Sequence, residues 1–348
     1  MHIKFIRRFA AIALGCSALL AGCGGGGGGE VASNPGTTPT NPTTPLPAPV
    51  AAGRLWSSDT TVLDGQGTFV ADLVAGTTVK VDTVSESVPS ADGSELLRRA
   101  YTSNGSVGDV TRITSVRTAD GKLVVDLTVD GYAGALLPSP VAPHVVLTRW
   151  APSINEDRSA VVYDIDTQKV LFATPPSARP EAVAWLPDGQ LLRVKPSGQV
   201  TRMALGGTEQ AVATLTWPEA RVPQAAYVSP DGTKVVVQLA ALRDTGSVAG
   251  VDLWMMNIDG SNFTRFTKND LIANAFWSPD SKFVGFTKDT GIVCTAATCQ
   301  GSCNVWYAGV TASNVVAVAA SGDAQQFSVK RLSGTTATLS CPVMAWTR

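Results

Sequence analysis

The chain has 348 residues, of which 44% are hydrophobic and 16% are charged, and its formal net charge is −1. This balance excludes a strongly basic surface that would hold nucleic acid by neutralising phosphates, so no nucleic acid partner is expected. The hydrophobic content excludes disorder of the whole chain, and the length is ample for a core. Only two histidines occur, His2 and His144, which argues against a histidine-rich metal site or a relay of imidazoles.

The first 22 residues predict an export signal. Lys4, Arg7 and Arg8 form a positive start, and an apolar run over 9–21 follows. That run is shorter than the roughly 20 residues of a bilayer span. It ends in LAGC, which resembles the lipobox of bacterial lipoproteins. The resemblance implies lipidation of Cys23, with several acyl chains that anchor the mature chain to a membrane; an ordinary secretory signal is the alternative.

Residues 23–53 predict a disordered tether. Six glycines follow Cys23, and a stretch rich in Pro and Thr comes after them. Polyglycine is flexible and Pro-rich sequence is extended, so no packed core is expected here. Gly24 stands where retention in the inner membrane would favour Asp, so we expect the outer membrane, facing the periplasm, with surface exposure as the alternative. Removal of residues 1–22 leaves a formal charge of −4.

Residues 54–348 predict a separate domain with an internal repeat. Three segments align, namely EAVAWLPDGQLLRV from Glu181, QAAYVSPDGTKVVV from Gln224 and ANAFWSPDSKFVGF from Ala273. Each predicts an apolar strand that ends in an aromatic residue, a tight turn and a β-branched strand; the aromatic residues are Trp185, Tyr227 and Trp277. Repeats of this period are typical of propeller blades or solenoid turns.

The turns share one mechanism, in which Pro presets φ, Asp caps the turn and Gly accepts a positive φ. The predicted turn signature consists of Pro187, Asp188, Gly189, Pro230, Asp231, Gly232, Pro279, Asp280, Asp259 and Gly260. We expect these carboxylates to cap turns rather than to bind calcium or to transfer protons. Two tryptophans, Trp254 and Trp306, are expected at equivalent places on third strands.

The SPDG turn at Ser229, the WSPD segment at Trp277 and the LWMMNIDGSNFTRFT run resemble the repeats of TolB-like β-propellers, which also form the propeller domains of prolyl oligopeptidases. The resemblance covers roughly 181–310 and implies four-stranded antiparallel blades. Segments 109–129 and 159–174 fit as third and fourth strands of two more blades. Two strands after Gly322 and two within 55–84 would close the ring. The prediction is an all-β propeller of six blades, with seven blades or a pair of β-sandwiches as alternatives.

Four cysteines lie in the predicted propeller, at Cys294, Cys299, Cys303 and Cys341. In an oxidising compartment they predict two disulfides, of which three connectivities are possible. The first three are expected in a loop of one blade and the fourth in the last strand. A zinc site with four thiolates is the alternative, although no close C-x₂-C pair is present.

No catalytic residue is predicted, and no cofactor or metal. A Gly-x-Ser-x-Gly nucleophile elbow is absent, since the stretch GSVAG at Gly246 has the wrong spacing. His144 has no recognisable serine or cysteine partner. Asp164 and Asp166 are expected on one face of a strand, where a weak cation site is conceivable.

The sequence therefore predicts a non-catalytic lipoprotein of the cell envelope, anchored to a membrane through Cys23. Its propeller is expected to bind or scaffold an envelope protein, because the loops at one end of a propeller converge on a common face. The alternative is a ligand sensor or enzyme that acts on glycans or peptides at the propeller axis.

Overall fold

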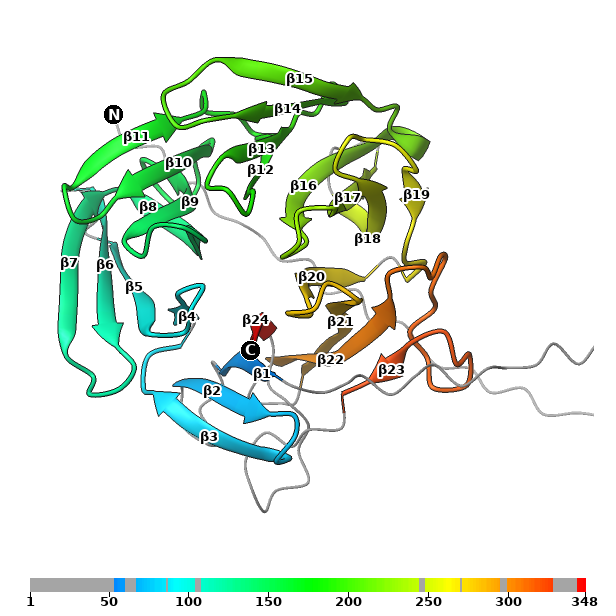
Figure 1. The fold of residues 1–348 in the computed structure, drawn as a ribbon, viewed down its shortest axis with the longest axis horizontal. Coiled ribbons are helices and arrows are strands. Elements are labelled where there is room, and N and C mark those ends of the chain that lie inside the picture. Colours follow the sequence, from blue (N-terminus) through cyan, green and yellow to red (C-terminus); the bar gives the residue numbers. More distant parts are fainter. Residues whose placement is uncertain are drawn as a thin grey trace, which may run out of the picture. The chain divides into compact units, whose positions relative to one another are not determined.

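The computed structural model shows a ring of six antiparallel sheets (Figure 1). It describes residues 53–59, 67–85, 87–103, 108–243, 248–269, 271–294, 299–327 and 343–348, with only the backbone of 59, 291–294 and 299–302. Each sheet has four strands. The predicted all-β propeller is confirmed, with six blades and not seven.

Blades 2 to 6 are each formed by four consecutive strands, which run from the ring axis outward (Figure 1). Blade 2 contains β4 (Val88–Pro89), β5 (Glu95–Ser103), β6 (Asp109–Arg117) and β7 (Leu123–Asp130). Blade 3 contains β8 (Tyr132–Pro138), β9 (Val145–Ala151), β10 (Ser159–Asp164) and β11 (Lys169–Ala173). Blade 4 contains β12 (Ala182–Trp185), β13 (Leu191–Val194), β14 (Gln199–Met203) and β15 (Glu209–Thr214).

The last two consecutive blades follow the same plan. Blade 5 contains β16 (Arg221–Val228), β17 (Lys234–Leu242), β18 (Val248–Asn257) and β19 (Thr264–Arg265). Blade 6 contains β20 (Ile272–Trp277), β21 (Phe283–Cys294), β22 (Cys299–Gly309) and β23 (Gln325–Gln326). Trp254 and Trp306 lie on the third strands of these blades, as predicted, and segments 109–129 and 159–174 supply the predicted third and fourth strands of blades 2 and 3.

Blade 1 closes the ring with strands from both ends of the described chain. Its innermost strand is β24 (Val343–Thr347), followed outward by β1 (Arg54–Asp59), β2 (Gly67–Asp72) and β3 (Thr77–Asp82). The indole of Trp56 donates a hydrogen bond to the Thr347 hydroxyl at 2.9 Å, which ties the two ends together.

The predicted split of two strands from each end was wrong, because three strands come from the N-terminal side and one from the C-terminal side. The tail supplies only one strand here because Gln325–Gln326 already serves as the fourth strand of blade 6. The remainder of the predicted strand FSVKRLSG, after Phe327, lies outside the described residues.

Two further expectations require correction. The cysteine segment is not a loop, because backbone pairing of β21 and β22 continues from Phe283↔Gly309 as far as Cys294↔Cys299. Asp166 is not on a strand, because β10 ends at Asp164, whose side chain accepts hydrogen bonds from the amides of Asp166 and Thr167 and so starts a turn.

The core consists of six apolar clusters, each packed between neighbouring blades. Adjacent residues of one strand serve different clusters, since Met255 packs toward blade 6 and Met256 toward blade 4. Because successive side chains of a strand point to opposite faces of the sheet, every blade packs against both of its neighbours. Apart from a 3₁₀ turn at Pro218–Ala220, the described residues form no helix, and none that is long and apolar enough to cross a membrane.

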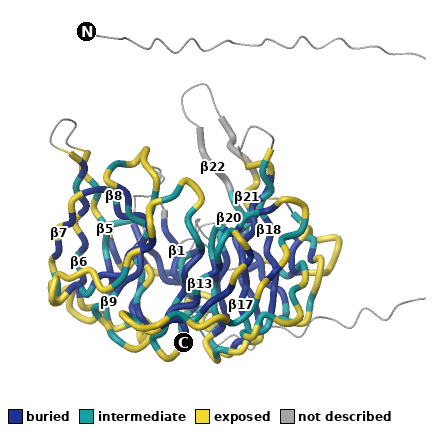
Figure 2. The backbone as a smooth tube through the Cα atoms, turned by 90° about the horizontal axis from the view of Figure 1, so that it is seen from above, coloured by how far each residue is buried: buried dark blue, intermediate teal, exposed yellow. Residues whose placement is uncertain are grey.

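The ring has two chemically distinct faces. In an antiparallel meander the connections alternate between the two ends of the sheet, so turns between first and second and between third and fourth strands share one end. We call that end the turn face; it includes 186–190, 229–234 and 278–283. The opposite hairpin face holds the connections between second and third strands, such as 151–159, and those between blades. Exposed residues gather along both faces and buried residues lie between them (Figure 2).

Candidate binding site

The predicted turn residues lie on the turn face, where each Asp caps its own turn. Asp231 accepts hydrogen bonds from the Ser229 hydroxyl at 2.6 Å and from the Thr233 amide at 3.0 Å. Burial raises the pKa of Asp231, but these hydrogen bonds outweigh it and the pKa is lowered. Asp188, Asp280 and Asp259 likewise accept a backbone amide two residues on, at 3.1, 3.1 and 2.9 Å. These carboxylates therefore accept hydrogen bonds from the backbone of their own turns, as expected for capping residues.

The third turn contains Ser281 where the first two contain Gly189 and Gly232. All three adopt positive φ, at +60°, +80° and +71° respectively, a conformation that costs a residue with a Cβ roughly 1–2 kcal/mol. The Ser281 hydroxyl accepts a hydrogen bond from the Asp231 amide at 3.1 Å, which joins the turns of blades 5 and 6. This contact compensates in part for the backbone conformation.

Tryptophans at the ends of first strands join the blades to one another. The Trp277 indole donates to the Tyr227 carbonyl of blade 5, and the Trp185 indole donates to the Leu137 carbonyl of blade 3, both at 2.9 Å. The alignment of Tyr227 with these tryptophans was wrong by one residue, because Val228 occupies the equivalent register position before the turn. The Tyr227 hydroxyl instead donates a hydrogen bond to the side-chain carbonyl of Gln238.

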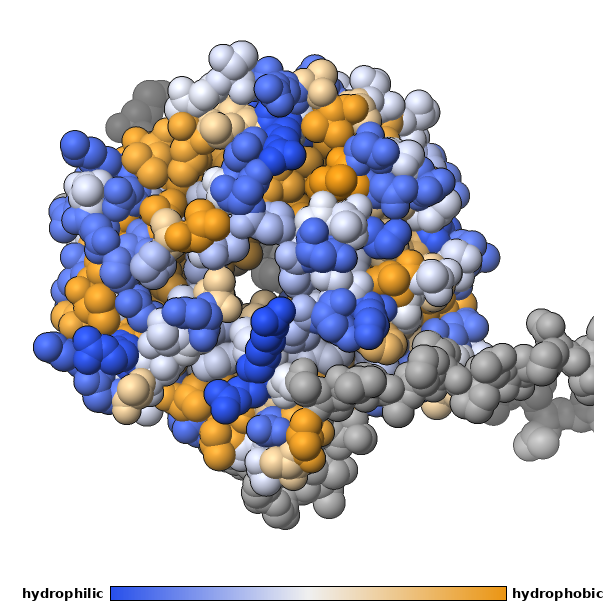
Figure 3. Space-filling view, viewed as in Figure 1, coloured by the Kyte–Doolittle hydropathy of each residue, from blue (hydrophilic) through white to orange (hydrophobic). Residues whose placement is uncertain are grey.

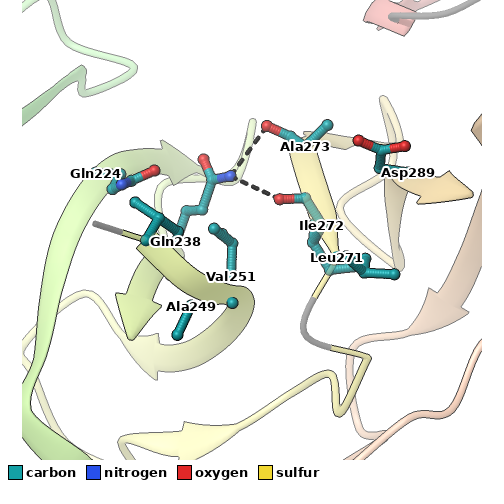
Figure 4. Close-up of a pocket in the computed structure, with 10 residues that line it drawn as sticks. Gln224, Gln238, Ala249, Val251, Leu271, Ile272, Ala273 and Asp289 are labelled. Carbon is teal, nitrogen blue, oxygen red and sulfur yellow. Dashed lines mark hydrogen bonds between the residues drawn. The ribbon is translucent and has the colours of Figure 1, made fainter. Parts of the chain in front are cut away.

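A pocket of about 350 Å³ opens between blades 5 and 6 on the hairpin face (Figure 4). It lies where β18 and β20 begin, beside the part of β21 that continues past the end of its pairing with β20. Its lining residues are Gln224, Gln238, Val248, Ala249, Gly250, Val251, Leu271, Ile272, Ala273 and Asp289. Figure 3 shows the ring along its axis, with a hollow at the centre.

Gln238 spans the base of the pocket. Its side-chain amide donates hydrogen bonds to the carbonyls of Ile272 and Ala273, both at 3.0 Å (Figure 4). Sequence analysis did not select Gln238, although a glutamine inside the apolar strand KVVVQLAAL is a visible signal. A buried amide in such a strand needs partners, and here they are supplied by the next blade.

The position of Gln238 recurs in other blades, and we call it the bridging position. In blade 2 it is Arg99, whose guanidinium donates to the Ala133 carbonyl of blade 3 at 2.9 Å. In blade 3 the bridging position is found from an equivalent hydrogen bond: the Ser139 amide donates to the Val145 carbonyl as the Ser229 amide donates to the Lys234 carbonyl in blade 5. Gln238 lies four residues after Lys234, and the residue four after Val145 is Arg149. The guanidinium of Arg149 makes no hydrogen bond or ion pair with a described residue.

His144 lies on the turn face between two carboxylates. Its Nδ1 is 2.7 Å from Asp166 Oδ2, and its Nε2 is 3.0 Å from Glu95 Oε1 in blade 2. Burial lowers the pKa of His144, but the hydrogen bonds to Glu95 and Asp166 outweigh it and the pKa is raised. The Ser115 hydroxyl donates to Glu95 and does not reach the imidazole. The cluster therefore lacks the contact between nucleophile and base that acyl transfer needs.

Several predicted site residues are not tested by the described part of the chain. Cys23 and the tether lie outside it, as do the side chains of Cys294, Cys299 and Cys341. Cys303 is disulfide-bonded, while the identity of its partner stays a prediction. Among the residues whose side chains are described, no group of three or more His, Cys, Asp or Glu is placed to hold a metal ion.

No protein-family model and no curated protein matches the sequence significantly. Among solved structures, the chain is similar to a GH74 enzyme from Niastella koreensis, with 12% identity and a TM-score of 0.47 over 75% of this chain and 42% of that one. It is also similar to a protein described as TolB from Agrobacterium tumefaciens, with 15% identity and a TM-score of 0.46 over 79% and 87% of the two chains.

A third similar structure is a protein described as a 6-phosphogluconolactonase from Bacteroides uniformis, with 13% identity and a TM-score of 0.45 over 79% and 81% of the two chains. Identities this low concern the fold alone. The ring of six four-stranded sheets defines the class, which is a six-bladed β-propeller.

Proposed function

We propose that this protein is a non-catalytic binding protein of the cell envelope, anchored by lipid at Cys23 and held at the outer membrane by the tether 24–53. In this proposal the propeller needs no cofactor and faces the periplasm. It binds an envelope protein with the hairpin face, and the pocket between blades 5 and 6 receives a side chain of that partner.

The composition of the pocket is the observation that carries the proposal. Of its ten lining residues only Asp289 is ionisable, and the others are two glutamines and small or apolar residues. Hydrolysis of a glycosidic bond normally needs two carboxyl groups, and acyl transfer needs a nucleophile with a base. Amides beside apolar surface instead suit recognition without chemistry.

The rim of the pocket supports a protein partner. Val248 and Leu271 are 44% and 50% exposed at its edge, and Gln224 and Gln238 contribute amides within it. Exposed aliphatic side chains around a polar pocket are typical of surfaces that bury an apolar anchor of a partner.

Site-specific photo-crosslinking in cell envelopes tests this surface. A photoreactive amino acid at Leu271 should trap one partner protein, and the same residue at Val74, 74% exposed on the turn face, should not. Equal trapping at both positions, or none at Leu271, would contradict the proposed surface. Turnover of a glycan or peptide library that is lost in Asp289→Asn would support the enzyme alternative instead.

The lipid anchor is tested separately. Growth with an alkyne fatty acid should label the full-length protein, and Cys23→Ser should abolish both the label and sedimentation with membranes. Labelled membranes separated by density should place the protein in the outer membrane. A protein that stays unlabelled would overturn the anchor without affecting the crosslinking result.

A further inference from the structure

Blade 3 gathers arginines on the hairpin face. Arg149 pairs in register with Ala160, and Arg158 lies two residues before Ala160, so both side chains emerge on the same side of the sheet. Tyr132 pairs with Ala151, two residues after Arg149, and therefore shares that side. Because Ala151 is small, the Arg158 side chain can pass over it toward Tyr132.

The Tyr132 ring connects Arg158 to a third arginine from blade 2. The guanidinium carbon of Arg158 lies 5.5 Å from the ring centroid, and that of Arg99 lies 5.7 Å from it. Arg99 Nη1 also donates to the Tyr132 hydroxyl at 3.3 Å and to the Ala133 carbonyl. These contacts fix the position of Arg99 and bring its charge to the same edge of the blade.

The charges of Arg149 and Arg158 are not balanced by a described carboxylate. Neither makes an ion pair with a residue in the described part of the chain, although the exposed Glu156 and Asp157 lie in the loop just before Arg158. Burial and the charge of Arg158 lower the pKa of Arg149. Arg193 on blade 4 gives the contrast, because it lies 2.7 Å from Glu181 and 3.0 Å from Glu209.

We propose that Arg149 and Arg158, together with Arg99, form a binding site for a phosphate group carried by a ligand. Guanidinium groups on the same side of a sheet with no acid between them repel one another, and a bound oxyanion replaces that repulsion by attraction. Guanidinium donors match the oxygens of phosphate in a bidentate geometry. Since two charges are unbalanced, a phosphate monoester with nearly two negative charges fits better than a single carboxylate. The site is independent of the proposed protein partner.

Isothermal titration of the full-length protein tests the site, with inorganic phosphate, glycerol phosphate and acetate at one ionic strength. Both phosphates should bind, and acetate should bind at least about tenfold more weakly. Arg149→Gln and Arg158→Gln should each weaken phosphate binding by about tenfold or more, because each removes charged hydrogen bonds. Arg149→Lys should give an intermediate loss, because the charge remains and the bidentate geometry does not.

Arg112→Gln is the matched control, because Arg112 is an exposed arginine already paired with Asp126 in blade 2. It removes the same charge and should change phosphate affinity less than about twofold. Thermal melting of each variant verifies that it is folded. The proposal is overturned if the native protein does not bind phosphate, if Arg149→Gln and Arg158→Gln bind as tightly as it does, or if Arg112→Gln weakens binding equally. Tighter binding of short-chain phosphatidic acid, which is also a phosphate monoester, than of glycerol phosphate supports the site and assigns its ligand to a lipid headgroup.

Discussion

The interface between blades 5 and 6 and the interface between blades 3 and 4 share a design and differ at one position. In both, a tryptophan indole donates to a carbonyl of the preceding blade. At the bridging position, however, Gln238 bonds to the next blade, whereas Arg149 makes no such bond. A position that holds the ring together in one blade is thus available for a ligand in another. The repeat therefore identifies what is structural, and departures from it identify candidates for function.

The largest effect is expected where an inter-blade hydrogen bond is buried. Trp277→Phe should lower the free energy of unfolding by about 2–3 kcal/mol, because the Tyr227 carbonyl loses its donor and some packing is lost. Urea denaturation measures the change. Trp306→Phe is the control, because the Trp306 indole nitrogen is buried without a hydrogen-bond partner among the described residues. Its loss should be clearly smaller, and equal losses would mean that packing alone stabilises this interface.

A smaller loss is expected at the bridging position of blade 5. Gln238→Leu should cost about 1–2 kcal/mol, because the carbonyls of Ile272 and Ala273 lose their donor while water can enter from the pocket. Gln224→Leu, in the same pocket, should change the free energy of unfolding by less than about 0.5 kcal/mol, since Gln224 makes no side-chain hydrogen bond to a described residue. Similar losses in the free energy of unfolding for the two variants would show that the hydrogen bonds of Gln238 do not stabilise the fold.

The sequence predicted blades 4 to 6 well because their turns repeat in a form that fixes strand order and register. One further copy was missed. In blade 2, Ser90 and Asp92 form the same capped turn as Ser229 and Asp231, with a hydroxyl-to-carboxylate hydrogen bond of 2.6 Å in each. Ala91 replaces the proline there, and the turn does not need proline, because Asp and a positive-φ glycine suffice.

Recognition of that turn would have located the bridging position in blade 2, because Arg99 follows Ser90 at the same distance as Gln238 follows Ser229. Blade 3 could not be aligned in this way, since its turn is longer and lacks the aspartate. Closure of the ring by strands from both ends was predicted correctly, but the number of strands that each end supplies was beyond sequence reasoning. The strands of blade 1 are not marked by the repeated turn motif. The number of strands that each end of the chain supplies therefore depends on tertiary packing.

The junction of blades 2 and 3 should show a weak pH dependence. The pKa of His144 is raised, so its protonated form is favoured in the folded state. Its contribution is complete below the unfolded pKa of about 6.5 and is lost as the pH rises through the folded pKa. The facing charges are Glu95 and Asp166, with Asp164 nearby. The free energy of unfolding should fall by less than about 1 kcal/mol between pH 6 and pH 8.

His144→Gln distinguishes this source of pH dependence from others. The variant should have the same free energy of unfolding at pH 6 and at pH 8, because a glutamine can bond to the carboxylates but does not titrate. Urea denaturation at the two values measures it. A difference that persists in His144→Gln would assign the pH dependence to another group.

The smallest effect is expected at Arg149, where the two interfaces differ. Arg149→Leu removes a charge that faces Arg158 and loses no hydrogen bond within the described chain, so the free energy of unfolding should change by less than about 0.5 kcal/mol or rise slightly. Arg99→Leu, at the equivalent position, should cost about 1 kcal/mol, because it leaves the Ala133 carbonyl without its donor. Thermal and urea denaturation of the two variants measure the difference. A large loss in Arg149→Leu would show that this arginine stabilises the ring, and the contrast between the interfaces would then have to be abandoned.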